Sequence, residues 1–153
     1  MKRRVAKPAH AAAALALPLV IAGAVAIVPA AADMQHGYPA KPLLSTGKTV
    51  ADETIHYPTT GPAQVTAAIV TIAPGGKTIV HRHGVPLFAY ILDGEVTVDY
   101  GDRGKHTYHK GDAFMEAMGV PHLGINNGTE PVRILAVYMG AQGAKNVIPD
   151  KEQ

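Results

Sequence analysis

Apolar and polar residues alternate in short runs over the second part of the chain, from residue 64 to residue 138. The runs are rich in β-branched residues, and none shows a 3.6-residue period over the length of a helix. This pattern predicts short strands over residues 64–72, 77–82, 87–92, 95–100, 105–109, 113–116, 122–126 and 132–138. Seven or eight such strands are typical of a sandwich or barrel, so we expect an all-β domain.

Turn sequences that contain glycine separate these runs, for example at residues 74–76, 101–104, 110–112 and 126–128. Asp93-Gly94 is the strongest hairpin signal, because alternating apolar residues flank it on both sides and Asp-Gly favours a two-residue turn. We therefore expect the strands at 87–92 and 95–100 to pair with each other.

The first 32 residues have a different pattern. Four basic residues precede an apolar run that ends in Ala30-Ala31-Ala32. A basic start, an apolar run and a small-x-small end are typical of a secretory signal peptide. We predict an export signal over residues 1–32, cleavage before Asp33, a periplasmic or secreted product, and no stable membrane anchor after cleavage. The alternative is an uncleaved membrane anchor, because the run is nearly long enough to span a bilayer.

Removing this segment changes the charge of the chain. The sequence has 14 basic and 12 acidic residues, and four of the basic ones precede Asp33, so ten basic against twelve acidic residues leave a net charge of −2. No basic patch remains to favour nucleic acid as a partner. Cysteine is absent, which excludes disulfides, thiolate metal ligands and a cysteine nucleophile.

The 121 residues after the predicted cleavage point suffice for one domain. Residues 33–62 are rich in Pro, Gly, Ser and Thr, which predicts an extended N-terminal segment with edge strands. The barrel is expected over residues 63–140, and the polar residues 141–153 predict a C-terminal tail. Exposed strand edges in a small barrel often pair with another copy. We expect a homodimer, with residues 49–57 as a pairing strand.

Two histidines separated by one residue, His81 and His83, occur at the end of the predicted strand over residues 77–82. Because side chains alternate along a strand, both imidazoles point to the same face. His122, in another predicted strand, is the best candidate for a third ligand. We predict a site for a divalent transition metal. Neutral imidazole suits Fe, Mn, Ni, Cu or Zn, so the ligands alone do not identify the ion.

The sequence around these histidines resembles the two motif blocks of the cupin superfamily. The first block matches at four positions, which are Gly75, His81, His83 and Gly94. The second also matches at four, which are Gly111, Gly119, His122 and Asn126. Leu87 stands where the first block has glutamate, and Ala117 where the second has proline. The resemblance implies a cupin-type double-stranded β-helix, which is a jelly-roll barrel, after the signal segment.

The resemblance also implies that the three histidines bind the metal ion inside the barrel. Leu87 leaves the fourth ligand open, and three outcomes remain. The histidines alone hold the ion and leave positions for water, dioxygen or substrate. Alternatively, Glu116 replaces the missing glutamate, because an unpaired carboxylate in an apolar strand is costly to bury; otherwise Glu116 faces solvent or pairs with a basic residue. In the third outcome the metal is lost and the barrel binds something else.

Two functions are consistent with this site. The first is a metal-dependent enzyme, for example a dioxygenase or another cupin-type enzyme, that acts on a small organic molecule. In it, Glu116 is a ligand or general base, and Tyr90 is a candidate proton or hydrogen-bond donor. The alternative is a non-catalytic, metal-dependent barrel that binds a small molecule or serves as a structural domain.

Overall fold

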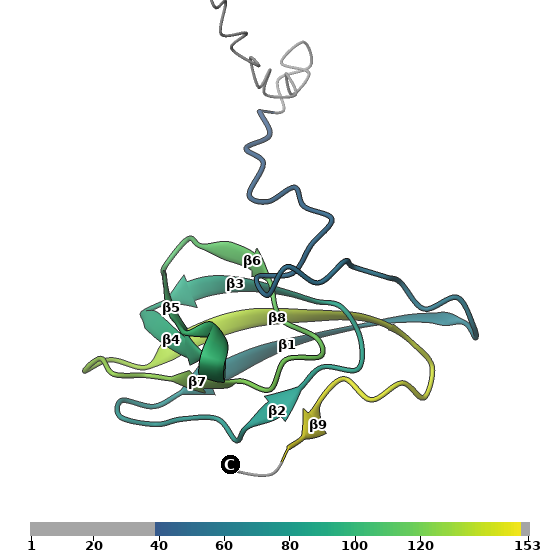
Figure 1. The fold of residues 1–153 in the computed structure, drawn as a ribbon. Coiled ribbons are helices and arrows are strands. Elements are labelled where there is room, and N and C mark those ends of the chain that lie inside the picture. Colours follow the sequence, from purple (N-terminus) through teal and green to yellow (C-terminus); the bar gives the residue numbers. More distant parts are fainter. Residues whose placement is uncertain (1–38, 151–153) are drawn as a thin grey trace, which may run out of the picture. The chain divides into compact units, whose positions relative to one another are not determined.

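The computed structural model describes residues 39–150, and the predicted export signal lies outside them. The chain divides into two units, residues 1–40 and 41–153, and every described strand belongs to the second. The strands are β1 (Ala63–Ile72), β2 (His81–Arg82), β3 (Leu87–Asp93), β4 (Glu95–Asp99), β5 (Lys105–His109), β6 (Ala113–Met115), β7 (Leu123–Ile125), β8 (Val132–Ala141) and β9 (Ile148–Pro149) (Figure 1). No helix in this part of the chain is both long and apolar enough to cross a membrane.

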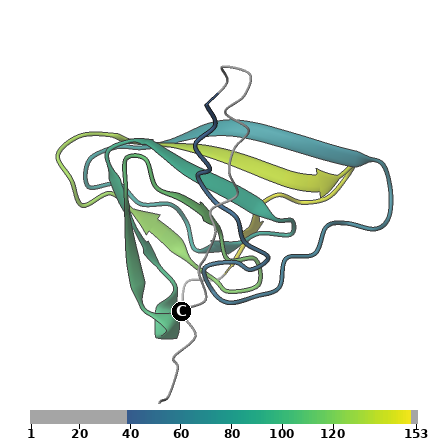
Figure 2. The same ribbon diagram turned by 90° about the horizontal axis from the view of Figure 1, so that it is seen from above.

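The strands form two main antiparallel sheets. One has the order β1-β8-β3-β6 and the other the order β5-β4-β7, while β2 and β9 form a small third sheet. Figure 2 shows the strands arranged around a common interior. The all-β prediction is confirmed, and two sheets around one core are consistent with a jelly-roll barrel.

The alternation of side chains along β3 explains why this segment is a strand. Leu87, Ala89 and Ile91 are buried, whereas the residues between them are partly exposed. Ile91 is 0% exposed, and full burial of such a side chain contributes about 1.5–3 kcal/mol. One face of β3 therefore belongs to the core, and the other faces outward.

The expected hairpin at Asp93-Gly94 does not form. β3 pairs with β6 and β8, whereas β4 pairs with β5 and β7, so Gly94 connects the two sheets. The register of β3 against β8 shifts between Ile91 and Asp93, and a bulge of this kind bends a strand. Gly94 has a φ of 74°, and a Cβ there would lie 3.0 Å from the backbone of Pro131 and Val132. The prediction was wrong because a turn sequence does not specify which strands pair across it.

The core lies between the two main sheets and contains residues from both. Its buried members are Ile72, Ala89, Ile91, Val96, Val98, Tyr100, Phe114, Ala117 and Val132. A second buried cluster contains Val85, Leu87, Ala136 and Tyr138. The inner faces of β3, β4 and β8 therefore form one packed interior, and the walls of the site come from it.

Two segments outside the predicted barrel also pack onto it. Residues 39–62 contain no strand, only an isolated bridge between Lys48 and Thr54. The N–H of Val50 within that turn donates a hydrogen bond of 2.9 Å to the carbonyl oxygen of Met115 in β6. Near the other end of the chain, β9 pairs with β2, so part of the segment predicted as a tail contributes a strand.

Candidate metal centre

The structure brings the three predicted ligands His81, His83 and His122 together. His81 begins β2, His83 follows that strand, and His122 immediately precedes β7. His81 and His122 form an antiparallel bridge, in which each backbone N–H donates to the carbonyl oxygen of the other at 3.0 Å. One ligand nitrogen from each of the three rings lies within 4.8 Å of the other two. The group has the size and donor set of a metal site.

Backbone carbonyl groups orient all three rings. The Nδ1 atoms of His81, His83 and His122 lie 2.8, 3.0 and 2.8 Å from the carbonyl oxygens of Ile79, Asn146 and Val120, respectively. A carbonyl oxygen only accepts, so each Nδ1 carries the proton and donates. The lone pair of every neutral ring is therefore on Nε2. A hydrogen bond from the other ring nitrogen, here Nδ1, is typical of histidines that bind metals.

The Nε2 atom of His122 provides a test of whether a metal ion fits. It is buried and has no hydrogen-bond partner among the described residues. The carboxylate oxygen Oε2 of Glu116 lies 3.9 Å away, which is too far for a hydrogen bond. A buried nitrogen without a partner costs free energy, and a bound ion would satisfy its lone pair. Together with a ring nitrogen from His81 and one from His83, this nitrogen forms a three-imidazole donor set that fits a first-row transition ion.

Burial lowers the pKa of all three histidines from the usual 6.5. For His83 the pKa falls to about 4. The hydrogen bond from each Nδ1 to its carbonyl oxygen opposes this shift, but loss of hydration is the larger effect. The rings are therefore neutral at pH 7, which is the form that binds a metal ion.

Glu116 lies beside the histidine group, not within it. The residue is 6% exposed, and its Oε1 accepts hydrogen bonds from the hydroxyl of Tyr100 at 2.8 Å and from the N–H of Ala117 at 2.7 Å. Burial raises the pKa of Glu116 to about 7, although both hydrogen bonds oppose the rise. Its other oxygen is the one that faces His122. The carboxylate is thus paired and buried, and does not face solvent.

Tyr90 lies on the outer face of β3. Its neighbours Ala89 and Ile91 both point into the core, so strand alternation directs Tyr90 the opposite way. It is paired across the sheet with Leu135 of β8 and is not among the residues that line the cavity at the histidines. This placement gives no support to a catalytic role for Tyr90.

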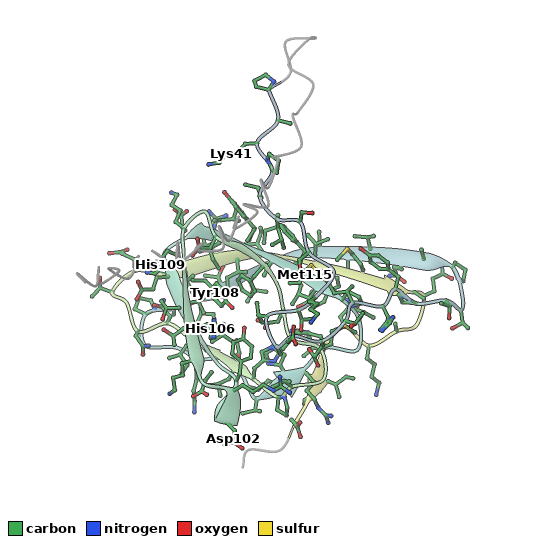
Figure 3. The ribbon with its side chains drawn as sticks, turned by 45° about the horizontal axis from the view of Figure 1, so that its top comes forward. Lys41, Asp102, His106, Tyr108, His109 and Met115 are labelled. Atoms are coloured by element: carbon green, nitrogen blue, oxygen red, sulfur yellow. The ribbon has the colours of Figure 1, made fainter. Side chains whose placement is uncertain are left out.

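Two other tyrosines lie near the histidines. The hydroxyl of Tyr100 donates to Glu116, and the ring of Tyr138 in β8 lies 5.7 Å from that of His83. Tyr108 of β5, which is labelled in Figure 3, extends this network. Its hydroxyl lies 3.4 Å from that of Tyr100. Burial raises the pKa of Tyr100 above the usual 10, so it stays protonated. Tyr100 was not singled out from the sequence, although the alternation of residues 96, 98 and 100 in the predicted strand could have placed it on the buried face.

A cavity of about 80 Å³ lies at the histidine group. Its polar wall includes the three histidines and Glu116, and its apolar wall includes Leu87, Phe114 and Tyr138. A larger open cleft of about 500 Å³ is lined in part by Arg103 and Asp99, and it shares only His122 with the cavity among the described residues. Since the smaller cavity contains all three ligands and the buried acid, we assign the site to it.

The C-terminal segment supports the strand that carries two of the ligands. It supplies β9 and the Asn146 carbonyl that holds His83, and the N–H of Asp150 donates to the carbonyl oxygen of Val80 at 2.9 Å. Gly84 allows this close approach, because a Cβ at that position would collide with the carbonyl oxygen of Lys145. Residues 145–150 are therefore part of the candidate centre, which no motif in the sequence indicated.

Glu53, in the N-terminal turn, supports the loop that leads to His122. Its carboxylate accepts hydrogen bonds from the backbone N–H groups of Met118 and Gly119 at 2.8 and 2.7 Å. The carbonyl oxygen of Met118 in turn accepts the N–H of His83 at 3.0 Å. Glu53 thus supports the loop before His122, and that loop in turn binds His83.

Asn126, the last residue of the second motif block, holds a turn. Its side-chain N–H groups donate to the carbonyl oxygens of Ile72 and Glu130 at 2.9 and 2.8 Å, and its Oδ1 accepts the N–H of Gly128 at 2.9 Å. These contacts use both side-chain N–H donors and the side-chain oxygen. Asn126 therefore stabilises the turn between β7 and β8 and does not orient His122.

Comparison with solved structures gives related folds. The oxalate decarboxylase of Lactobacillus farciminis, in a formate complex, is 26% identical with a TM-score of 0.49, over 56% of this chain and 26% of that one. The polyketide cyclase RemF from Streptomyces resistomycificus is 21% identical with a TM-score of 0.51, over 65% and 69%. A cupin-superfamily sugar phosphate isomerase from Silicibacter pomeroyi is 19% identical with a TM-score of 0.44, over 57% and 68%.

The likeness to RemF shows the fold alone. The chain spans about a quarter of the length of the decarboxylase. No curated protein matches the sequence. Residues 68–138 match the family model of the cupin domain. This range contains the motif residues from His81 to Asn126. The family resemblance is thereby confirmed, and the domain that holds the three histidines belongs to the cupin superfamily.

Proposed function

We propose that this protein binds a divalent transition-metal ion through the Nε2 atoms of His81, His83 and His122, and that it is a metal-dependent, oxygenase-like enzyme acting on a small organic molecule. One observation carries the proposal. Each Nδ1 donates to a backbone carbonyl oxygen, which leaves three Nε2 lone pairs at a buried cavity. Such a donor set suits Fe, Mn, Ni, Cu or Zn.

The contacts of each side chain support a role. The three histidines would hold the ion at the cavity that they line. A metal ion bound there would supply Lewis acidity to a small molecule in that cavity. Glu116, 3.9 Å from Nε2 of His122, is near enough to become a further ligand or to accept a proton from a bound substrate. The hydroxyl of Tyr100 holds the Glu116 carboxylate in position.

Leu87 favours the alternative, a metal-dependent barrel that binds a small molecule without turnover. At the position of the motif glutamate, Leu87 lines the cavity and offers no ligand atom. Paired variants separate the two functions. For an enzyme, His83→Ala loses both metal and activity, whereas Glu116→Ala loses activity. For a binding barrel, His83→Ala loses metal and ligand affinity, and no activity exists to lose.

Elemental analysis of the protein from Asp33 onward, purified without a metal-binding tag, tests the metal site directly. We expect about one transition-metal ion per chain, and none in the His81→Ala/His83→Ala variant. The ion that is found decides which reactions to assay. If the protein takes up no Fe, Mn, Ni, Cu or Zn after reconstitution, the metal-dependent function is excluded.

We also propose a homodimer, formed through the edge of β1. This ten-residue strand lies at one end of its sheet and contains no proline and no charged residue. Val65 and Ile69 on it are 66% and 49% exposed, and an apolar edge of this kind pairs readily with another chain. Residues 49–57, the pairing strand expected from the sequence, are a weaker candidate, because Val50 and Glu53 in this segment bind their own barrel. Light scattering should give a dimer for the natural sequence and a monomer for Val65→Lys/Ile69→Lys.

Export remains a proposal that depends on the basic and apolar sequence of residues 1–32. Sequencing the N-terminus of the protein recovered from a cell fractionation tests it. A periplasmic or secreted chain that begins near Asp33 supports export, and an intact chain in the membrane fraction supports the anchored alternative.

A further inference from the structure

We infer that the ligand bound at the metal centre is a small molecule of about four non-hydrogen atoms or fewer, and that Leu87 sets this size limit. The inference rests on the proposed metal site and names the class of molecule that the site accepts. Four features support it: the volume of the cavity, the side chain at Leu87, the rigidity of the wall behind it, and the separation of the larger cleft.

The volume of the cavity limits the number of atoms that fit. It measures about 80 Å³, whereas an apolar cavity of about 150 Å³ in a protein core holds one benzene molecule with its six carbon atoms. Pockets that enclose drug-sized ligands are larger still, at roughly 300–1,000 Å³. With a metal ion at the histidines, the remaining space suits a molecule of three or four atoms.

Leu87 occupies the wall where the cupin motif has a carboxylate ligand. It is 5% exposed and lines the cavity, so its isobutyl group takes up space in the interior. The carbonyl oxygen of Leu87 accepts the N–H of Glu116 at 2.9 Å, which holds the main chain at this position. The replacement thus removes a ligand atom and also adds apolar volume beside the metal site.

The wall behind Leu87 has no room to retreat. Leu87 packs with Val85, Ala136 and Tyr138 in a buried cluster, and β3 is paired with β6 on one side and β8 on the other. A larger ligand would have to displace a paired strand or leave a side chain strained, and interiors of this density resist both.

The larger cleft does not relieve this limit. It shares only His122 with the cavity among the described residues, and the Nδ1 of that ring is tied to Val120. A molecule in the cleft therefore meets one histidine and not the group of three.

Titration of the Co²⁺-loaded protein with azide, which has three non-hydrogen atoms, and with benzoate, which has nine, tests the inference by visible absorption. We expect azide to change the ligand-field spectrum, and benzoate to bind at least about tenfold more weakly. In Leu87→Ala, benzoate should bind about tenfold or more tightly than in the natural protein, while azide changes little. Leu135→Ala is the matched control, because its neighbours Ile134 and Ala136 line the cavity and Leu135 does not.

The outcomes separate this inference from the proposed function. Failure of the natural protein to take up Co²⁺ or any of Fe, Mn, Ni, Cu and Zn, detected by elemental analysis before titration, overturns both. Uptake of Co²⁺ followed by equal binding of benzoate and azide overturns the size limit and leaves the metal site intact. The comparison of the two probes on the natural protein does not depend on the folding of any variant.

Discussion

β2 and β3 follow each other in the chain, yet they are supported in different ways. β3 pairs with two neighbours, β6 and β8, and its inner face is part of the main core. β2 has two residues, pairs with β9, and reaches the rest of the barrel through the bridge between His81 and His122. The scaffold is therefore stabilised by packing, whereas the ligand strand is positioned by contacts from the two ends of the described chain.

Because of this difference, substitutions can change the free energy of unfolding and the affinity for metal separately. The free energy of unfolding should depend most on β3 and the core behind it. The affinity for metal should depend most on the contacts that hold the histidines, which include those of Glu53 and of residues 145–150. Each variant below is expected to change one property more than the other.

Ile91→Ala should have the largest effect and change stability. Ile91 is fully buried in β3, and truncation of such a residue costs about 2–5 kcal/mol because it leaves a cavity. Urea denaturation of the metal-free protein measures this loss, and metal affinity should change little. Leu43→Ala, at a residue that is 53% exposed, is the control and should cost under about 1 kcal/mol. Equal losses for the two variants would contradict the role given to β3.

Glu116→Gln should change how stability depends on pH. Burial raises the pKa of Glu116 from 4.5 to about 7, so the folded state binds this proton more tightly than the unfolded state does. Its contribution to stability is complete below pH 4.5 and is lost as the pH rises through 7. Relative to the glutamine variant, the natural protein should lose up to roughly 3 kcal/mol between pH 4.5 and pH 8.

Denaturation of the metal-free natural protein and the glutamine variant at both pH values measures this difference. The histidine contributions are common to the two proteins and cancel. A difference in unfolding free energy that stays constant with pH would show that Glu116 ionises normally.

Gly84→Ala should weaken metal binding more than it weakens the scaffold. The added Cβ collides with the carbonyl oxygen of Lys145 and displaces the segment that holds His83. Loss of such a supporting contact typically costs about 10–100-fold in metal affinity, which a competition titration with a chelating dye measures. Gly47→Ala is the control, because nothing lies within 4 Å of a Cβ there. Unchanged metal affinity in Gly84→Ala would show that this segment does not position His83.

Glu53→Gln should have the smallest effect, about three- to tenfold in metal affinity, because one charged acceptor oxygen becomes an amide NH₂ that faces a backbone N–H. The Co²⁺ spectrum should shift as well, since the loop before His122 moves. Asp52→Asn is the control, because that exposed neighbour pairs only with Lys48 through its side chain. A loss of stability in Glu53→Gln with an unaltered Co²⁺ spectrum would reduce Glu53 to a structural role.

Most strand positions could be predicted from the alternation of apolar residues. The observed β5 coincides with the prediction over residues 105–109, and β3 extends the predicted strand at 87–92 by one residue. The pairing of strands was less accessible, because Asp93-Gly94 has the sequence of a hairpin turn and instead passes between sheets. Tyr90 was singled out for its chemistry, although alternation alone directs it outward and directs Tyr100 inward.

The sequence by itself determined the strand pattern, the three histidines and the family, because residue spacing along an extended backbone decides which side chains share a face. Only the tertiary structure decided what surrounds them. The Asn146 carbonyl that orients His83 is 63 residues away in sequence, and the Glu53 carboxylate that binds Met118 is 65 residues away. Contacts at such separations depend on how the whole chain packs, so a local sequence pattern does not predict them.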